Sequence, residues 1–334
     1  MRALYSVSLS LLAVVMLVVV ALVGVRAAAG RWLFGVILPY LAFATFVVGM
    51  IWRVVVWGRA PVPFRIPTTG GQQKSLPWVK NSNLESPHNL LGVVGRMALE
   101  VLFFRSLLRN TKAEVREGPR MVYRSEKLLW SAGLAFHWAL LVVVVRHLAF
   151  FLDPVPGPVA AVGALDSFFR TGTPTLYMTD AVLLAAVTFL FLRRILDSQL
   201  RYFSLPADYF PLFLILGIAA SGVLMRCFVR VDLEKVKELA LGLATFRPIL
   251  PAEIGVLFYV HLFLVSFLLA YFPFSKLTHL GGVFLNPTRN LANDSRARRH
   301  INPWDYPVIV HTYQEYEDEF RDKMKAAGLP LEKE

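Results

Sequence analysis

Long apolar runs constrain this chain more than any other feature of its sequence. Five runs carry no charged residue, and most approach the roughly 20 residues that a helix needs to cross a bilayer. These runs are Ala3 to Val25, Trp32 to Trp52, Leu128 to Val145, Tyr209 to Met225 and Ile254 to Ser275, and a sixth, Thr171 to Leu192, carries one charge, Asp180. A soluble domain of 334 residues would struggle to hide a composition that is 56% hydrophobic, with a mean hydropathy of +0.54. The pattern predicts an all-α integral membrane protein with a bundle of six transmembrane helices.

The apolar runs and the polar segments between them divide the chain into four regions. We expect two transmembrane helices in residues 1–57, a cytoplasmic loop in 58–126, a four-helix membrane region in 127–281 and a cytoplasmic tail in 282–334. The first run is followed by Ala27-Ala28-Ala29, which is typical of a signal-peptide cleavage site. Its apolar core is too long for a signal peptide, so we expect a retained anchor, with removal as the alternative.

The loop contains a segment that is neither a spanning helix nor an ordinary turn. From Asn89 to Asn110, apolar residues are interrupted by Arg96, Glu100, Arg105 and Arg109. This spacing predicts an amphipathic helix that lies on the cytoplasmic membrane interface. A seventh, charged span is the alternative, and it would invert every later segment.

The tail is richer in aromatic residues than a solvated terminus needs. It contains Trp304, Tyr306, Tyr313, Tyr316 and Phe320 and ends in a charged helical stretch near Tyr313 to Lys325. A frayed basic tail is one interpretation. We favour a docking surface for a cytoplasmic partner.

Lysine and arginine counts predict the orientation in the membrane. With six spans, one side carries Arg2, twelve basic residues between Gly58 and Lys127, three between Arg193 and Asp208, and nine after Ser275, whereas the other side carries nine in all. Both ends are therefore expected in the cytoplasm, in a multi-pass protein of the inner (cytoplasmic) membrane. The net charge of +12 then reflects topology and contact with anionic membrane lipids, and no nucleic acid is expected as a partner.

Cysteine is almost absent. Cys227 is the only one, so no disulfide can form within the chain and cysteine-ligated iron–sulfur clusters are excluded. The C-x-x-C-H motif that attaches haem covalently is also missing.

Four histidines lie in or next to the apolar runs, where a polar side chain is costly and is a functional hypothesis by default. His137 and His147 are ten residues apart, which is about 15 Å along a helix and some 80° around it, so they cannot bind one metal. His261 and His279 lie eighteen residues apart, on nearly the same face and up to about 27 Å apart, less if Pro273 ends the helix.

Because the two helices run in opposite directions, each histidine finds its partner on the other helix. His137 pairs with His279 at the inner side, and His147 pairs with His261 at the outer side. Each pair can supply two axial imidazoles to one iron, so the spacing predicts two haem b groups. Two alternatives stay open: ordinary hydrogen bonds between helices, and a proton relay in a proton-coupled transporter. Zinc or copper fits poorly, because no second ligand lies three or four residues from any of the four.

These intervals of ten and eighteen residues resemble those of the gamma subunit of respiratory nitrate reductase, a dihaem cytochrome b that oxidises quinol. The resemblance covers roughly Trp32 to Gly281. The additional first span, the long loop and the tail, from Asn286-Pro287-Thr288-Arg289-Asn290 to His311-Thr312-Tyr313-Gln314-Glu315-Tyr316-Glu317, resemble the DsrM family, the cytochrome b subunits of the DsrMKJOP complex of dissimilatory sulfur metabolism.

The resemblance implies a redox subunit rather than a self-sufficient enzyme, with no catalytic residue of its own. It implies electron exchange between menaquinone and a cytoplasmic iron–sulfur subunit similar to heterodisulfide reductase, DsrK. DsrJ, DsrO and DsrP would be further partners, and DsrC an indirect one. A cytochrome b subunit of another nitrate-reductase-like or heterodisulfide-reductase-like complex is the alternative.

A quinone site needs groups that exchange protons beside a haem. Arg146, next to His147, and Arg170 and Asp180, around the start of the fourth span, are the candidate contacts. Arg146 has the further interpretations of a snorkelling side chain or a partner for a haem propionate.

Overall fold

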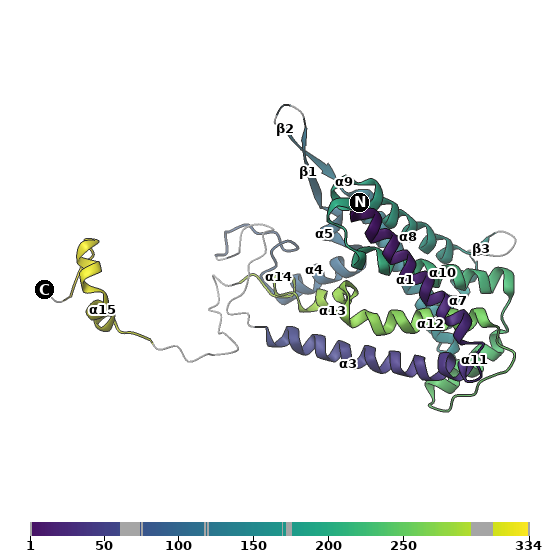
Figure 1. Cartoon of the computed structure of the whole chain (residues 1–334). Coiled ribbons are helices and arrows are strands. Elements are labelled where there is room, and N and C mark those ends of the chain that lie inside the picture. The colour runs from purple at the N-terminus through teal and green to yellow at the C-terminus, as the bar shows by residue number, and fades with distance from the viewer. Residues whose placement is uncertain are drawn as a thin grey trace.

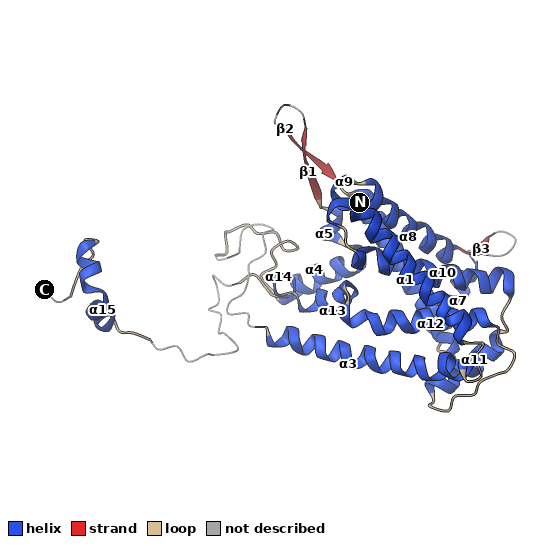
Figure 2. Cartoon of the chain, viewed as in Figure 1, coloured by secondary structure: helices blue, strands red, loops and turns tan. Residues whose placement is uncertain are grey.

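The computed structural model describes residues 2–60, 74, 76–116, 118, 120–168, 170–171, 176–294 and 310–332. Trp304 and Tyr306 of the expected tail lie outside these residues. The chain is mostly helical, with two short pairs of strands (Figure 2).

Five helical segments among the described residues are long and apolar enough to cross a membrane, and they coincide with the five uncharged runs. They are α1 (Arg2–Gly24), then α2 (Gly30–Trp32), η1 (Leu33–Ile37) and α3 (Leu38–Arg59) as one segment, α6 (Lys127–His147) with η2 (Leu148–Phe150), α10 (Pro206–Leu224) with η3 (Met225–Val229), and α12 (Val256–Tyr271) with η4 (Phe272–Phe274). The five uncharged spans expected from the sequence are thereby confirmed as helices of spanning length.

The sixth run forms a helix that differs from the other five. Helix α8 (Met178–Leu196) begins seven residues later than the apolar run, because Arg170–Thr171 and Leu176–Tyr177 pair as the strands β3 and β4 before it. Its 19 residues rise about 28 Å, but they include Asp180, Arg193 and Arg194. Helix α8 packs against both α6 and α10, so it belongs to the same bundle.

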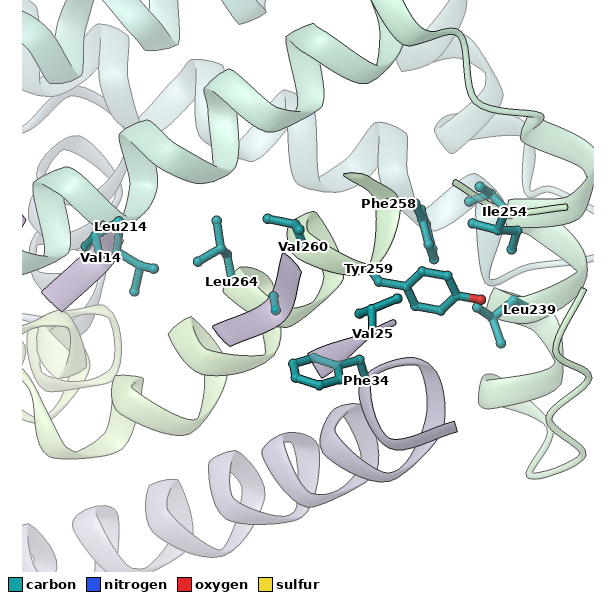
Figure 3. Packing of buried hydrophobic residues seen from close by; sticks show 12 residues of the cluster. Val14, Val25, Phe34, Leu214, Leu239, Ile254, Phe258, Tyr259, Val260 and Leu264 are labelled. Atoms are coloured by element: carbon teal, nitrogen blue, oxygen red, sulfur yellow. The ribbon is translucent and has the colours of Figure 1, made fainter. Parts of the chain in front are cut away.

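The core lies where α1, α10 and α12 meet (Figure 3). Its buried side chains include Val14, Leu214, Leu239, Tyr259 and Leu264. Gly35, in the π-helical turn η1, permits this packing, because a Cβ there would lie 2.9 Å from Leu250 Cδ1 and 3.0 Å from Tyr259 Cε1. Many apolar side chains face outward, such as Leu4 at 73% exposure and Val48 at 66%. Such apolar exposure suits a bilayer better than water.

The segment 89–110 is helical, as expected, but it contains a break. Helix α4 (Leu90–Phe103) begins where the Asn89 side chain accepts a hydrogen bond from Gly92 N, and α5 (Arg105–Leu108) follows after Phe104, which has a left-handed backbone with φ 50°. Two tryptophans of α6 fasten this region: Trp138 Nε1 donates to Leu102 O at 3.0 Å and Trp130 Nε1 to Phe103 O at 2.7 Å.

The expectation of a wholly α-helical chain is wrong between α5 and α6. Strands β1 (Thr111–Arg116) and β2 (Arg120–Ser125) form an antiparallel hairpin that projects beyond the helices (Figure 1). The physical reason is local: Gly118 adopts φ 80° in the turn, which glycine does at little cost, and Val122 and Tyr123 favour extended backbone.

Shorter elements complete the described chain. They are α7 (Gly157–Phe168), α9 (Ser198–Phe203), α11 (Leu233–Ala244), η5 (Lys276–Thr278), α13 (His279–Gly282), η6 (Val283–Leu285), α14 (Pro287–Asn290) and α15 (Tyr313–Ala326). Helix α15 confirms the helical stretch expected near Tyr313 to Lys325. It begins with a capping box of Thr312 and Glu315 and lies apart from the bundle (Figure 1).

Candidate functional site

His147 and His261 face each other from α6 and α12. Their ring centroids are 6.5 Å apart and their planes are 21° apart. His147 Nδ1 lies 2.7 Å from Val143 O, one turn earlier on α6. His261 Nδ1 lies 2.9 Å from Ser221 Oγ on α10, so three helices define this pair.

His137 and His279 form a second pair. His137 lies on α6, ten residues before His147, and His279 starts α13. Their ring centroids are 5.9 Å apart and their planes are 82° apart. His137 Nδ1 lies 2.7 Å from Gly133 O, and His279 Nδ1 lies 2.9 Å from Lys276 O. The structure therefore brings together the two combinations that antiparallel helices predict.

His279 reaches this position because α12 does not continue to it. Helix α12 ends at Tyr271, and Pro273 follows in the 3-10 turn η4. Proline lacks an N–H and ends the regular hydrogen-bond series. Ser275 then caps η5, its hydroxyl accepting from Leu277 N at 3.2 Å, and His279 starts α13. The bend brings His279 beside His137.

The hydrogen bonds define which ring nitrogen of each histidine is available. A carbonyl oxygen only accepts, so Nδ1 of His137, His147 and His279 carries the proton and donates it. Ser221 Oγ donates to Ile218 O at 2.9 Å and therefore accepts from His261 Nδ1. In the neutral ring of each histidine, Nε2 is then the nitrogen that can accept, which is the usual state of a metal-binding imidazole.

The ring separations fit one metal ion between the members of each pair. A metal–nitrogen bond of about 2 Å on either side places two ring centres roughly 6 Å apart. Within the described part of the chain, no three His, Cys, Asp or Glu side chains gather at one point as a protein-only metal site requires. Two imidazoles with free Nε2 atoms suit a group such as haem, which brings its own equatorial nitrogens.

A buried ionic network lies beside His147. Arg146 donates to Asp180 Oδ1 at 2.9 Å and to Asp166 Oδ2 at 2.5 Å. Thr179 Oγ1 donates to the same Asp166 carboxylate at 2.8 Å. The Asp166 side chain is only 2% exposed. Both carboxylates therefore compensate the charge of Arg146.

Two further residues surround this network. The ring of Tyr177 lies under two guanidinium groups, with Arg146 Cζ 4.0 Å and Arg226 Cζ 3.7 Å from its centroid. Arg170 pairs with Tyr177 through the β3–β4 backbone, and its side chain lies outside the described residues. Of the three candidate quinone contacts, Arg146 and Asp180 form a direct ion pair. The backbone of Arg170 pairs with Tyr177, whose ring lies against Arg146.

Asp166, Thr179, Tyr177 and Arg226 were not among the residues expected at this site. Asp166 is the one acidic residue between Pro154 and Phe169, a weak signal, because α7 lies between predicted spans. The other three carry no distinguishing pattern, and only packing brings them to Arg146.

Comparison with known proteins gives the same picture. Residues 90–297, which include all four histidines, match the model of the nitrate reductase gamma subunit family. The chain is 49% identical over 280 residues to the Hdr-like menaquinol oxidoreductase cytochrome b-like subunit of Archaeoglobus fulgidus, covering 82% of this chain and 83% of the relative. It is 42% identical over 284 residues to the protein of the same description in Archaeoglobus profundus, covering 82% and 84%.

Both relatives are thus described as cytochrome b-like subunits of a menaquinol oxidoreductase. The histidine pairs, the spanning helices and the similarity over most of the chain agree, and the protein belongs to the nitrate reductase gamma subunit family, among relatives described as cytochrome b-like subunits.

Proposed function

We propose that this chain is a dihaem cytochrome b subunit that carries electrons between menaquinol and a cytoplasmic iron–sulfur partner. His137 and His279 would hold one haem b through Nε2, and His147 and His261 the other. When bound, the two haems would supply reversible one-electron exchange at iron. The observation that carries the proposal is the pair of facing imidazoles at each site, with all four Nδ1 atoms engaged as donors.

In this proposal the four histidines bind the haem iron through Nε2, and their Nδ1–H bonds fix the orientation of the rings. Each Nδ1–H bond prevents rotation of its ring and increases the basicity of the opposite nitrogen. Because α6 is continuous from Lys127 to His147, the two positions on it are about 15 Å apart along its axis. The two sites are therefore held at a defined separation by one helix.

We further propose six spans, with α8 as the fourth, and both termini in the cytoplasm. Helix α8 is long enough to span, and Arg146 on α6 neutralises Asp180, its only charge before Arg193. The basic residues then fall mainly on the side of the loop and the tail, as the positive-inside rule requires. This places His137 and His279 near the cytoplasm.

The outer pair is the proposed location for quinone chemistry. Arg146, Arg170 and Asp180 remain the proposed contacts, and Tyr177, whose ring lies against Arg146, joins them. Because Arg146 is held by two carboxylates, it is poised to orient a ligand group rather than to transfer a proton. Asp180, 13% exposed, is the proposed proton acceptor, with proton release to the outside.

The narrower identity that we propose is DsrM, with DsrK as the iron–sulfur partner, DsrJ, DsrO and DsrP as further subunits and DsrC as the indirect electron acceptor or donor. The Archaeoglobus relatives support a partner of the heterodisulfide reductase type through the words "Hdr-like" in their description. The loop and tail support it as well, because both would extend toward the cytoplasm. Sulfur metabolism is part of this narrower proposal.

Purification from membranes in mild detergent tests the proposal. We expect the absorbance bands of b-type haem, two haems per chain, and reduction by a menaquinol analogue. Protein that is folded and free of haem would overturn the proposal in favour of a histidine-relay transporter. Reconstituted complex that oxidises quinol without changing the membrane potential would refute the outward proton release.

A further inference from the structure

The tail segment 286–294 contacts the segment that contains α4 and α5 at two points, one just before α4 and one between α4 and the turn into α5. At the first, Asn293 N donates to Pro87 O at 2.6 Å and Asn293 Nδ2 donates to Ser86 Oγ at 2.5 Å. Asn293 is 6% exposed and Ser86 is completely buried. Buried polar groups that are paired in this way fix the register of the two segments.

At the second point, Arg289 of α14 forms an ion pair with Glu100 of α4, with Nη1 2.5 Å from Oε1. The same guanidinium donates to Ser106 Oγ at 2.7 Å. Both charged side chains are less than one third exposed, at 30% and 17%, so solvent weakens this pair less than it weakens a surface pair.

The Glu100 carboxylate also shapes the turn between α4 and α5. Its Oε2 accepts from Ser106 N at 3.0 Å, and the carbonyl of Glu100 accepts from Phe104 N at 3.0 Å. Phe104 therefore keeps a left-handed backbone with φ 50°, which an L-residue adopts only when its surroundings enforce it.

The α4–α5 turn contacts His137 of the His137–His279 pair. The Phe104 ring stands edge-on to His137, with centroids 4.9 Å apart and planes at 90°. The second histidine, His279, lies ten residues before Arg289, on the same piece of chain. Arg289 and Glu100 thus join the segment that carries His279 to the turn that packs on His137.

We propose that Arg289 and Glu100 are positioning residues for the His137–His279 pair. Their ion pair joins α14, which follows α13 and η6 along the chain, to α4 and its turn into α5. His279 needs such support because it lies beyond the end of α12 and has no continuous helix to place it. The inference rests on the proposed function, since it concerns the haem assigned to this pair.

The test uses the full-length chain in purified membranes and follows the low-spin ferric electron paramagnetic resonance signals. Arg289→Gln is expected to shift and broaden the signal of the haem held by His137 and His279 and to leave the other signal unchanged. The exchanged double variant Arg289→Glu with Glu100→Arg is expected to restore most of the original signal. Ser106→Ala, which keeps the ion pair, is expected to give a smaller change of the same kind.

Lys237→Gln is the control, because it removes a different ion pair, Lys237 of α11 with Asp153 in the loop after η2, at 3.2 Å. It is expected to change neither signal. An unchanged spectrum in Arg289→Gln, or equal loss of both signals, would overturn the inference while the proposed function stands. If Arg289→Gln does not accumulate, an unchanged signal in Ser106→Ala decides against the inference. Wild-type protein without haem would instead refute the proposed function.

Discussion

The imidazole rings of His147 and His261 lie nearly parallel, 21° apart, whereas those of His137 and His279 lie nearly perpendicular, 82° apart. Each angle is held by Nδ1–H bonds to neighbouring atoms of the fold. The angle between two axial imidazoles governs the splitting of the iron d orbitals, so two haems bound in this way should differ in their spectra.

The first prediction follows from these angles. Oxidised protein should show two low-spin ferric signals, a rhombic one from the His147–His261 site and a single feature at larger g from the His137–His279 site. Electron paramagnetic resonance at low temperature measures both. Two identical rhombic signals would contradict the geometry.

Ligand variants test the pairing. His137→Ala and His279→Ala should each remove the haem with the large-g feature, and His147→Ala and His261→Ala should each remove the rhombic one, because one imidazole of every pair is lost. Haem content and the resonance spectrum are the measurements. His88→Ala is the control, because the His88 ring contacts Asn81 and neither histidine pair. Loss of different haems within one pair would refute the assignment.

Ser221→Ala removes the acceptor for His261 Nδ1. We expect weaker retention of the haem at the His147–His261 site, by about 10–100-fold, as for other partners of metal-binding histidines. Ser221→Thr keeps the hydroxyl and should retain haem more tightly than Ser221→Ala. Competition with an apoprotein that takes up haem measures the release, and equal release from both variants would argue against a role for the hydroxyl.

Asp166→Asn breaks one arm of the buried network beside His147. Removing one partner of a buried ion pair costs about 3–5 kcal/mol, and the lower end applies because Asp180 still pairs with Arg146. Thermal unfolding in detergent should therefore show a clear loss of stability. Asp153→Asn is the control, since Asp153 is 66% exposed in its pair with Lys237 and should contribute almost nothing.

Asp197 predicts a pH dependence outside the membrane spans. Lys112 Nζ donates to its carboxylate at 2.9 Å, and this bond, with those from Gln199 N and Leu200 N, holds the pKa of Asp197 below its ordinary value of 3.8. A carboxyl with a lowered pKa in the folded state stabilises the fold at pH values above 3.8, and this contribution is lost as the pH falls through the folded pKa.

Asp197→Asn should therefore lower the unfolding temperature slightly near neutral pH, corresponding to less than about 1 kcal/mol. The difference from wild type should shrink as the pH falls below about 4, because the wild-type carboxylate is then protonated. Unfolding temperatures measured between neutral and acidic pH check this, and a constant difference would contradict it.

Several features could be predicted from the sequence because they depend on local periodicity. The uncharged runs predicted five helices of spanning length, and Thr312 with Glu315 marks the start of α15. The intervals of ten and eighteen residues predicted which histidines meet, since antiparallel helices leave only one arrangement in which both pairs lie at matching depths. These properties follow from helix pitch and chain direction, together with Pro273, which ends α12 before His279.

Other features were decided only by tertiary structure. Ser221 beside His261, Asp166 beside Arg146, and Arg289 beside Glu100 join segments that are 20 to 189 residues apart, and no periodic pattern connects them. The break at Phe104 has the same origin, because its strained backbone exists only where Glu100, Ser106 and His137 meet. The sequence by itself determined which imidazoles face each other, whereas packing between helices determined how each ring is turned, which proton it carries and which charges surround it.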